Sequence, residues 1–382
     1  MIEFHLDQNL PPLRTAEKLV PMRIKDLEIK PSEIKVNGKS YSMEIMEHRP
    51  NSQITLDTVR HWGEDRKVIC EIDKYGIPMT EVTNWTPGDM QFGELQDEIT
   101  EVEHLQILNT FLRSVNNIAK IEALDRDLEM SQFFIERYRM RRENIESTLQ
   151  HFIHLKIGRE RSEFVDYHQN LGTALKYMTE KLLERRTLNI QNLTLNGEHY
   201  PVFRLPENLK INVHNLGISN IERRLNLLQS ILSPSCLPLK NVTVDQFNRK
   251  DAECLKLEGL LIHRGDFVDA AQLSMLSRVH FPKLLNPVHE VHDFIRHWKR
   301  EAPEIGTHVS FAMLATSIEE VLEIIKNEPG AFEREGSIII PLVDGLEINV
   351  DDTSANTIGT QPLIPTRRLL HLKVQRKITV NA

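Results

Sequence analysis

The sequence predicts an α/β protein built from an irregular strand–helix repeat, similar to leucine-rich repeats, with a β-hairpin region near the N-terminus. Three observations support this prediction. Apolar and polar residues largely alternate over residues 22–45, apolar residues recur at helical spacing in later segments, and short β-rich runs alternate with helical stretches from Thr187 onward. Because the runs recur without a fixed period, an ordinary α+β arrangement is the alternative.

The N-terminal region, residues 1–95, is predicted to be rich in β-strands. Asn37-Gly38 interrupts the alternating residues 22–45, and this pair is the strongest short hairpin signal because both positions tolerate a positive φ. A further short strand is predicted over residues 67–72. We therefore expect a hairpin followed by turn-rich chain.

The central region is predicted to be a charged helical segment, residues 96–148, because apolar residues between Leu105 and Ile121 recur at helical spacing. A strand pair is expected over residues 149–158 and 162–168. An amphipathic helix is then predicted over residues 171–186. Its apolar face consists of Leu171, Ala174, Leu175, Met178 and Leu182.

The third region, residues 149–382, is predicted to be an α/β repeat-like domain. Helical stretches between its β-rich runs are predicted at residues 221–231, 270–276, 288–300 and 318–326. Short links between strands and helices favour right-handed crossovers, so the strands are predicted to be parallel. Ser317 to Glu320 has the pattern of a capping box at the start of the last helix.

Composition indicates an ordinary globular protein. The chain has 382 residues, is 40% hydrophobic and 27% charged, and has a net charge of −8. This acidic balance disfavours nucleic-acid binding as the main role, since phosphate contacts need a surplus of Lys and Arg. The sequence shows no secretory signal and no run of about 18 apolar residues, so we expect a cytoplasmic or nuclear protein without a membrane span. Cys70, Cys236 and Cys254 are then expected to be free thiols.

The stretch HEVHDFIRHWK, His289 to Lys299, is the densest cluster of reactive side chains, with three histidines, two carboxylates and a tryptophan. A helix turns by about 100° per residue, so its apolar residues fall on one buried stripe. These are Val291, Phe294, Ile295 and Trp298. We interpret the stretch as a structural helix with a solvated polar side.

A metal or catalytic site on this helix is the sharper alternative. His289, Asp293 and His297 fall on the polar side, but a zinc-protease motif needs a histidine where Asp293 stands. Arg296 and Arg300 lie among these residues and would repel a cation. An enzyme with an unrecognised site on helix 288–300 remains the alternative to a structural helix.

No other motif predicts catalysis. The sequence has no glycine-rich phosphate loop and no nucleophile elbow, and His263 and His308, in or beside β-rich runs, are interpreted as structural. The basic run Arg137–Arg142 is interpreted as a solvated helix face, with a nucleic-acid patch as the alternative. We therefore predict no enzyme and assign no catalytic, cofactor-binding or metal residue.

Seven stretches stand out for their order along the chain. They are LPPLRTAEKLVPMRIKDLEI, IKVNGKSYSMEI, IDKYGI with TPGDM, LKYMTEKLLERRTLNIQNLTL, LPENLKINVHNLGIS, LPLKNVTV and FIRHWKREAPEIGTHVSF. In this order they resemble the nematode F-box C proteins, a large family built on a nematode-specific domain of unknown function. The resemblance extends from about Leu10 to Phe311 and more weakly beyond.

The resemblance implies a non-catalytic protein-interaction module. Family members are thought to be F-box-type substrate receptors, which the Skp adaptor holds on a cullin-based ubiquitin ligase. Their F-box is a short helical motif before the region that matches LRTAEKLVP. Here MIEFHLDQNLPP precedes that region, so we expect a degenerate or truncated F-box and no detectable binding of the Skp adaptor unless an F-box lies upstream. The expected partner is a protein of unknown identity, rather than nucleic acid or a membrane.

Overall fold

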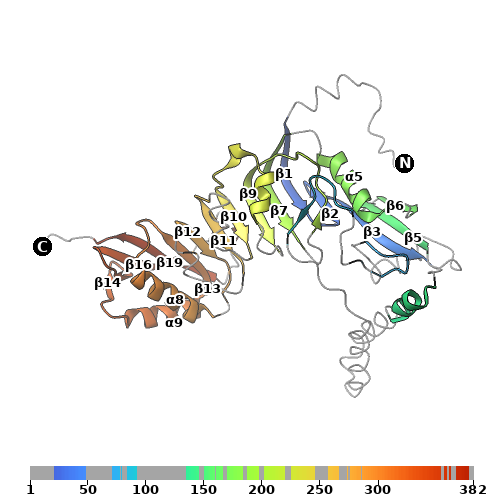
Figure 1. Cartoon of the computed structure of the whole chain (residues 1–382). Coiled ribbons are helices and arrows are strands. Elements are labelled where there is room, and N and C mark those ends of the chain that lie inside the picture. The colour runs from blue at the N-terminus through green and yellow to red at the C-terminus, as the bar shows by residue number, and fades with distance from the viewer. Residues whose placement is uncertain are drawn as a thin grey trace, which may run out of the picture. The chain divides into compact units, whose positions relative to one another are not determined.

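A computed structural model of the chain describes residues 21–48, 71–77, 79, 84–92, 135–145, 150–159, 161–166, 170–183, 187–197, 202–219, 225–245, 257–265, 273, 276–284, 286–353, 357–358, 361–362 and 367–377. The chain divides into two compact units (Figure 1). Unit 1 comprises Met1–Glu28, Arg186–Asn196 and Lys210–Ala382, and unit 2 comprises Ile29–Arg185 and Gly197–Leu209. Residues 1–20 and most of the predicted helical segment 96–148 lie outside the described residues.

Unit 2 contains an antiparallel sheet in the order β2-β3-β5-β6. Asn37 and Gly38, with φ of 50° and 83°, form the two-residue link between β2 and β3, which suits a turn with positive φ at both positions. Helix α5 contacts β3, and the short strand β4 pairs with β8. The bounds are β2 Glu33–Val36, β3 Lys39–His48, β4 Met90–Gln91, β5 Gln150–Ile157, β6 Arg161–Asp166, α5 Leu171–Leu183 and β8 Val202–Phe203.

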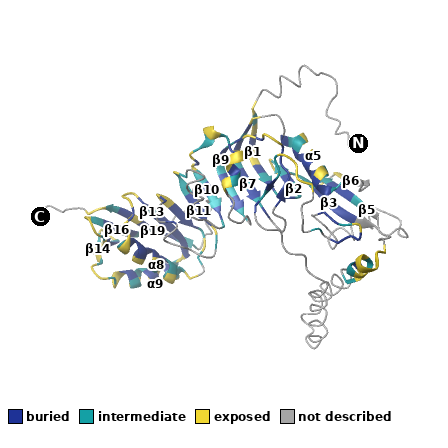
Figure 2. Cartoon of the chain, in the orientation of Figure 1, coloured by how far each residue is buried: buried dark blue, intermediate teal, exposed yellow. Residues whose placement is uncertain are grey.

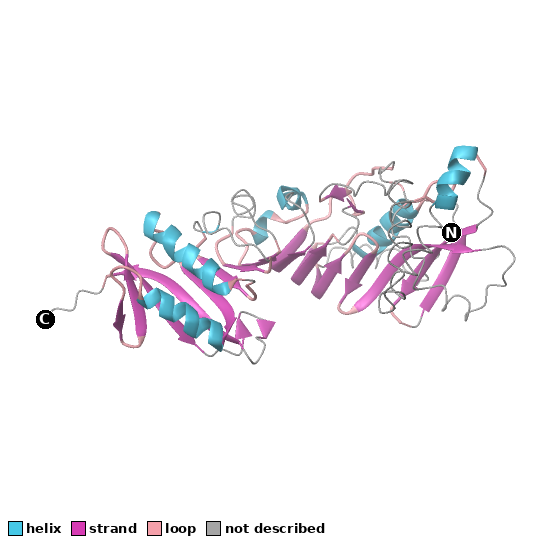
Figure 3. Cartoon of the chain, turned by 90° about the horizontal axis from the view of Figure 1, so that it is seen from below, coloured by secondary structure: helices cyan, strands magenta, loops and turns pink. Residues whose placement is uncertain are grey.

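Unit 1 contains a large sheet in the order β14-β15-β16-β19-β13-β12-β11-β10-β9-β7-β1. Its strands are drawn in magenta in Figure 3. Neighbouring strands from β7 through β13 are parallel, as the alternation of strands and helices predicts. The molecule is therefore a mixed α/β protein. The bounds are β1 Met22–Ile29, β7 Leu188–Asn196, β9 Ile211–Ser219, β10 Asn241–Val244, β11 Leu260–His263, β12 Arg278–Phe281 and β13 His308–Leu314.

The C-terminal strands of unit 1 correct the prediction of parallel strands throughout. β14, β15, β16 and β19 are antiparallel to their neighbours, and β19 also pairs antiparallel with β13. Glu335-Gly336 and Asp344-Gly345 have positive φ and form tight links, which join antiparallel strands because a parallel pair needs a longer crossover. The bounds are β14 Phe332–Arg334, β15 Ser337–Pro341, β16 Leu346–Thr353, β17 Thr357–Ile358, β18 Gln361–Pro362 and β19 Arg367–Arg376.

Helices α8, Pro287–Arg300, and α9, Ala315–Lys326, lie side by side against one face of this sheet (Figures 1 and 3). Helix α9 begins at Ala315 with Leu314 at the cap and no side-chain cap bond, so the predicted capping role of Ser317 is wrong. The described part of the predicted helix 221–231 is the 3-10 helix η2, Leu225–Ser230. A second 3-10 helix, η3, spans Pro234–Cys236.

Aromatic side chains fill the space between α8 and the sheet. Phe281 on β12 and Phe311 on β13 stack with their ring centroids 5.2 Å apart. Phe294 of α8 packs edge-on against both rings, at 5.7 and 5.6 Å. These side chains are fully buried. In Figure 2, α8 and the neighbouring strands show dark blue stretches of ribbon where residues are buried. Because side chains alternate along a strand, His308 and Ser310 lie on the opposite face of the sheet from Phe311.

Candidate functional site

The apolar stripe predicted for the histidine-rich helix is confirmed. Val291, Phe294, Ile295 and Trp298 of α8 are all 0% exposed. His297, which the helical phase places on the solvated side, is instead buried; its Nε2 has no hydrogen-bond partner among the described residues and lies 3.9 Å from Glu301 Oε2. The prediction is wrong for this residue because the buried surface of α8 is wider than the four-residue stripe.

The remaining polar residues of α8 lie at its surface. His289 and Asp293 are exposed, with 3.5 Å between His289 Nδ1 and Asp293 Oδ2. His292 and Lys299 both bind the carboxylate of Glu328, at 2.7 and 2.8 Å. The bond from Lys299 is the main reason that the pKa of Glu328 lies below its ordinary value. Within the described part of the chain, no group of three or more His, Cys, Asp or Glu side chains is placed to hold a metal.

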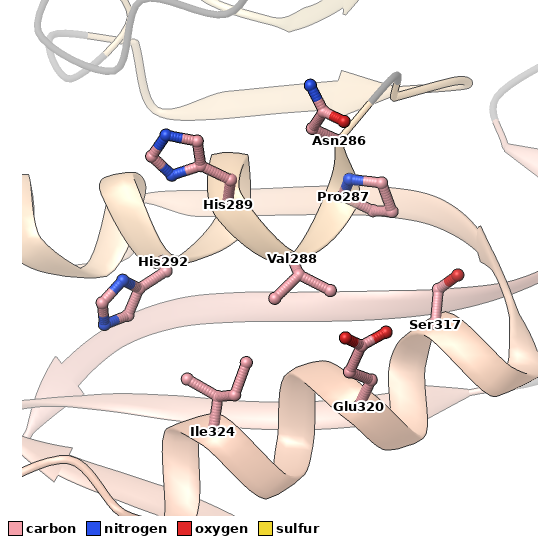
Figure 4. Close-up of a pocket in the computed structure, with 8 residues that line it drawn as sticks. All are labelled: Asn286, Pro287, Val288, His289, His292, Ser317, Glu320 and Ile324. Atoms are coloured by element: carbon pink, nitrogen blue, oxygen red, sulfur yellow. The ribbon is translucent and has the colours of Figure 1, made fainter.

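An open pocket of about 720 Å³ lies between the N-terminal half of α8 and one side of α9. Figure 4 shows that Val288 and Ile324 provide apolar walls, while His289 and His292 line one side and Glu320 the other. Its lining mixes apolar side chains, two imidazoles and one carboxylate from the two helices, so no single chemistry points to a ligand. We regard it as a secondary feature.

The basic run Arg137–Arg142 lies on a helix of residues 135–143 in unit 2. Arg137 is buried, and its Nη1 donates to the backbone oxygen of Tyr75 at 3.1 Å. Arg139 lies 3.9 Å from Glu136, and Arg141 lies 3.8 Å from Asp73. One guanidinium of the run is therefore structural, and two others face carboxylates, which weakens the nucleic-acid alternative.

Cys236 is the free thiol that the structure describes, and it is half-buried. Its Sγ donates to the backbone oxygen of Ser233 at 3.0 Å. Cys70 and Cys254 lie outside the described residues. Among the described residues, no helix is both long and apolar enough to span a membrane.

A ladder of amide side chains crosses the face of the unit 1 sheet that is opposite α8. Asn241 Nδ2 donates to Asn215 Oδ1 at 2.8 Å, and Asn215 Nδ2 donates to Asn192 Oδ1 at 2.7 Å. Asn192 Nδ2 then donates to the carboxylate of Asp26 at 2.7 Å. All donors point toward the anionic end, so each bond polarises the next one.

The ladder arises from a short motif that recurs on four adjacent strands. An apolar residue, any residue, Asn or Asp, and a second apolar residue occur in order in IKDL, IQNL, VHNL and LKNV, at residues 24–27, 190–193, 213–216 and 239–242. The two apolar positions are buried in all four copies. The motif is visible in the sequence, and aligning the β-rich runs on it would have predicted the ladder.

Basic side chains continue the same row of the sheet beyond the ladder. Asn241 pairs in register with Leu260, which pairs with Arg278. Arg278 pairs with His308 on β13, and His308 pairs with Lys373 on β19. We call the residues Asp26, Asn192, Asn215, Asn241, Arg278, His308 and Lys373 the polar row, and its last three residues the basic trio.

Two further histidines, His371 and His280, lie near His308 of the basic trio. His308 Nε2 lies 2.9 Å from His371 Nδ1, and His371 Nε2 lies 2.8 Å from Thr353 Oγ1. His280 is buried, and its Nδ1 lies 3.0 Å from Ser310 Oγ. Burial is the largest cause that lowers the pKa of His280 and of His308 to about 4, and burial also lowers the pKa of His371. The imidazoles of His280 and His308 are therefore neutral at pH 7.

His263 and His308, both interpreted as structural, have different surroundings. His263 is buried on the core face, 5.5 Å from the ring of Phe281, and burial lowers its pKa. His308 is half-buried on the polar face. Only His263 belongs to the packed interior, so the sequence-based interpretation of His308 missed its place in the polar row.

A separate hydrogen-bonded chain lies on the sheet of unit 2. Ser162 Oγ on β6 contacts His154 Nε2 on β5, and His154 Nδ1 lies 2.9 Å from Glu44 Oε1 on β3. The ring of Phe164 stacks on His154 with 4.4 Å between centroids. Lys156 also binds Glu44, at 2.7 Å. Ser162, His154 and Glu44 thus follow one another on three adjacent strands in the order of a nucleophile, its base and the carboxylate that orients the base.

Comparison with known proteins gives one match to a family model and no match to an individual protein. The family is described as a domain of unknown function, DUF3557, and its model matches residues 170–315. No curated protein and no solved structure matches the chain. The matched segment runs from α5 through β13 and thus includes the repeated strand motif from Asn192 onward, together with Arg278 and His308 of the polar row.

Proposed function

We propose that the chain is a non-catalytic protein-interaction module, related to the F-box C substrate receptors of a Skp–cullin ubiquitin ligase, and that its partner binds the polar row of unit 1. We further propose that the parallel strands β7 through β13 form a leucine-rich-repeat-like array following an N-terminal hairpin region. A cytoplasmic or nuclear location fits this role.

The observation that supports the proposal is the polar row itself. Asn192, Asn215 and Asn241 present short polar side chains at fixed positions, because each amide is held by its neighbour on the next strand. A buried aromatic and aliphatic core supports the strands from the other face. A rigid row of donors and acceptors loses little conformational entropy when a partner binds it.

Capturing and identifying the partner protein tests this proposal directly. An affinity-tagged chain would be expressed in its native organism, and captured proteins would be identified by mass spectrometry. Thr194→Arg with Thr243→Arg places bulky cations on the face of the polar row, since both residues share that face with the ladder. Thr173→Arg on the exposed side of α5 is the matched control.

The proposal predicts a set of captured proteins that the double variant loses and the control keeps. Recovery of the Skp adaptor and a cullin in the same set would support the ubiquitin-ligase relation. Capture of no protein above background, or the same proteins with the double variant, would contradict the proposal.

A second candidate function is nucleophilic catalysis at Ser162, which the chain Ser162–His154–Glu44 favours. A fluorophosphonate probe tests it, because Ser162 Oγ would attack phosphorus, fluoride would leave and His154 Nε2 would accept the proton. Labelling that Ser162→Ala and His154→Gln abolish, and that Ser233→Ala leaves intact, would support this function. An unlabelled native chain would exclude an activated serine there.

A further inference from the structure

Arg278, His308 and Lys373 occupy directly paired positions on three adjacent strands, although 95 positions separate the first from the last in the sequence. Arg278 and Lys373 are exposed, and His308 between them is half-buried. Neighbouring strands are about 4.8 Å apart, so the two cations arise about 10 Å from each other with the imidazole midway. Long Arg and Lys side chains can reach a common point above His308 from both sides.

Among the described residues, the two cations have no anionic partner. Neither Arg278 nor Lys373 forms an ion pair with a carboxylate in the part of the chain that the structure describes. Two other cations of the same sheet do have carboxylate partners, since Arg334 pairs with Glu347 and Arg368 pairs with Asp352. Both cations lie on the same face of the sheet with only a neutral imidazole between them, so an anion bound between them is attracted by both charges.

The charges of Arg278 and Lys373 also affect the pKa of His308. After burial and His371, the cations Arg278 and Lys373 are the causes that lower the pKa of His308. His280 from β12 and His371 from β19 face it, and the carboxylates of Asp351 and Asp352 on β16 act on His371. An anion above the trio would offset the two cations and favour the protonated form of His308.

We propose that the basic trio is an anion-binding site that receives a phosphorylated side chain of the partner protein. Two exposed cations match the two charges of a phosphate monoester, and the guanidinium can bind two of its oxygens. The net charge of −8 disfavours an extended polyanion, so a single anionic group on a protein segment fits better than nucleic acid. This inference rests on the proposed interaction function and names the chemistry of its partner.

The test uses the full chain, immobilised, and a degenerate peptide library with a fixed central phosphoserine, beside its unphosphorylated twin. Charge-assisted hydrogen bonds lead us to expect an enrichment of about tenfold or more for the phosphorylated library. Arg278→Gln with Lys373→Gln should abolish the enrichment. Arg376→Gln, an exposed cation on the same strand, should leave it unchanged.

A second readout follows His308 directly. Sulfate keeps both charges across the pH range in which imidazole titrates, so it serves as the free anion. In imidazole NMR of the full chain, sulfate should raise the pKa of His308 toward its ordinary value, and the Arg278→Gln, Lys373→Gln variant should not respond. Equal retention of the two libraries, or enrichment that survives in this variant, would overturn the inference. Sulfate binding without peptide enrichment would indicate a free-anion site and would also overturn it.

The experiments distinguish a failure of the phosphate inference from a failure of the proposed interaction function. If native partners are captured through the polar row but phosphatase treatment does not release them, the phosphate inference fails while the interaction function holds. If the Thr194→Arg, Thr243→Arg variant captures the same proteins as the native chain, the interaction function itself fails.

Discussion

Trp298 shows how one side chain of the histidine-rich helix contributes to stability rather than chemistry. Its ring is fully buried and packs edge-on against Phe294, with 6.2 Å between ring centroids. We expect Trp298→Ala to lower the free energy of unfolding by about 3–5 kcal/mol, because it removes a large buried aromatic. His289→Ala, on the exposed side of the same helix, should change it by less than about 1 kcal/mol. Denaturant unfolding followed by circular dichroism measures both, and equal costs would contradict the core assignment.

His280 gives the fold a pH dependence. Burial lowers its pKa from 6.5 to about 4, so the unfolded chain binds more protons than the folded chain between these values. Above pH 6.5, the titration of His280 therefore does not reduce the free energy of unfolding. As the pH drops toward 4, this one residue lowers the free energy of unfolding by about 3 kcal/mol.

The measurement is the free energy of unfolding between pH 7 and pH 4. His280→Asn removes the titrating group and should flatten the decline relative to the native chain. His289→Asn, an exposed histidine on α8, is the control and should leave the slope as it is. A native chain whose stability did not change across this range would contradict the burial of His280.

At the scale of elements, the amide ladder joins four strands through three bonds. Asn215 makes two of these bonds and Asn241 makes one. With about 1 kcal/mol for each net hydrogen bond, Asn215→Ala should destabilise unit 1 by about 2 kcal/mol and Asn241→Ala by about 1 kcal/mol. Equal costs at the two positions would show that the ladder bonds do not contribute separately to stability.

In unit 2, one carboxylate holds two buried cations. The side chain of Asp89 is fully buried, 3.2 Å from Lys176 Nζ of α5 and 2.6 Å from Arg204 Nη1. Asp89→Ala leaves both charges buried without their anion, which should cost about 3–5 kcal/mol. Asp293→Ala, at an exposed position, is the control and should stay within about 0.5 kcal/mol. Thermal unfolding distinguishes the two, and similar midpoints would mean that solvent reaches the Asp89 cluster.

Glu71 shows why part of this arrangement could not be predicted. Its carboxylate accepts hydrogen bonds from the backbone N–H groups of Leu171 and Gly172, at 3.0 and 2.5 Å, and so caps α5 from 100 residues away along the chain. The apolar positions predicted the helix itself from its own spacing. No local pattern could predict the cap, since it depends on the tertiary fold.

Across the whole molecule, local periodicity predicted elements better than their pairing. The start of α8 was placed within one residue, and the start of α5 was predicted at Leu171, where it is observed. The antiparallel pairing of the C-terminal strands was missed, although Asp344-Gly345 is a hairpin signal in the sequence. Ladder positions could have been found from the repeated Asn. Arg278 and Lys373 could not, because only the strand order brings them together.

The central claim is that the partner lies on the polar row of unit 1, and site-specific photocrosslinking tests it most directly. A benzophenone side chain would replace Thr243, which faces the row, and in a second version Tyr177, which is exposed on α5. After irradiation in cells, we predict a crosslinked partner from position 243 and none from position 177. Crosslinks of equal yield from both positions, or from position 177 alone, would contradict the claim.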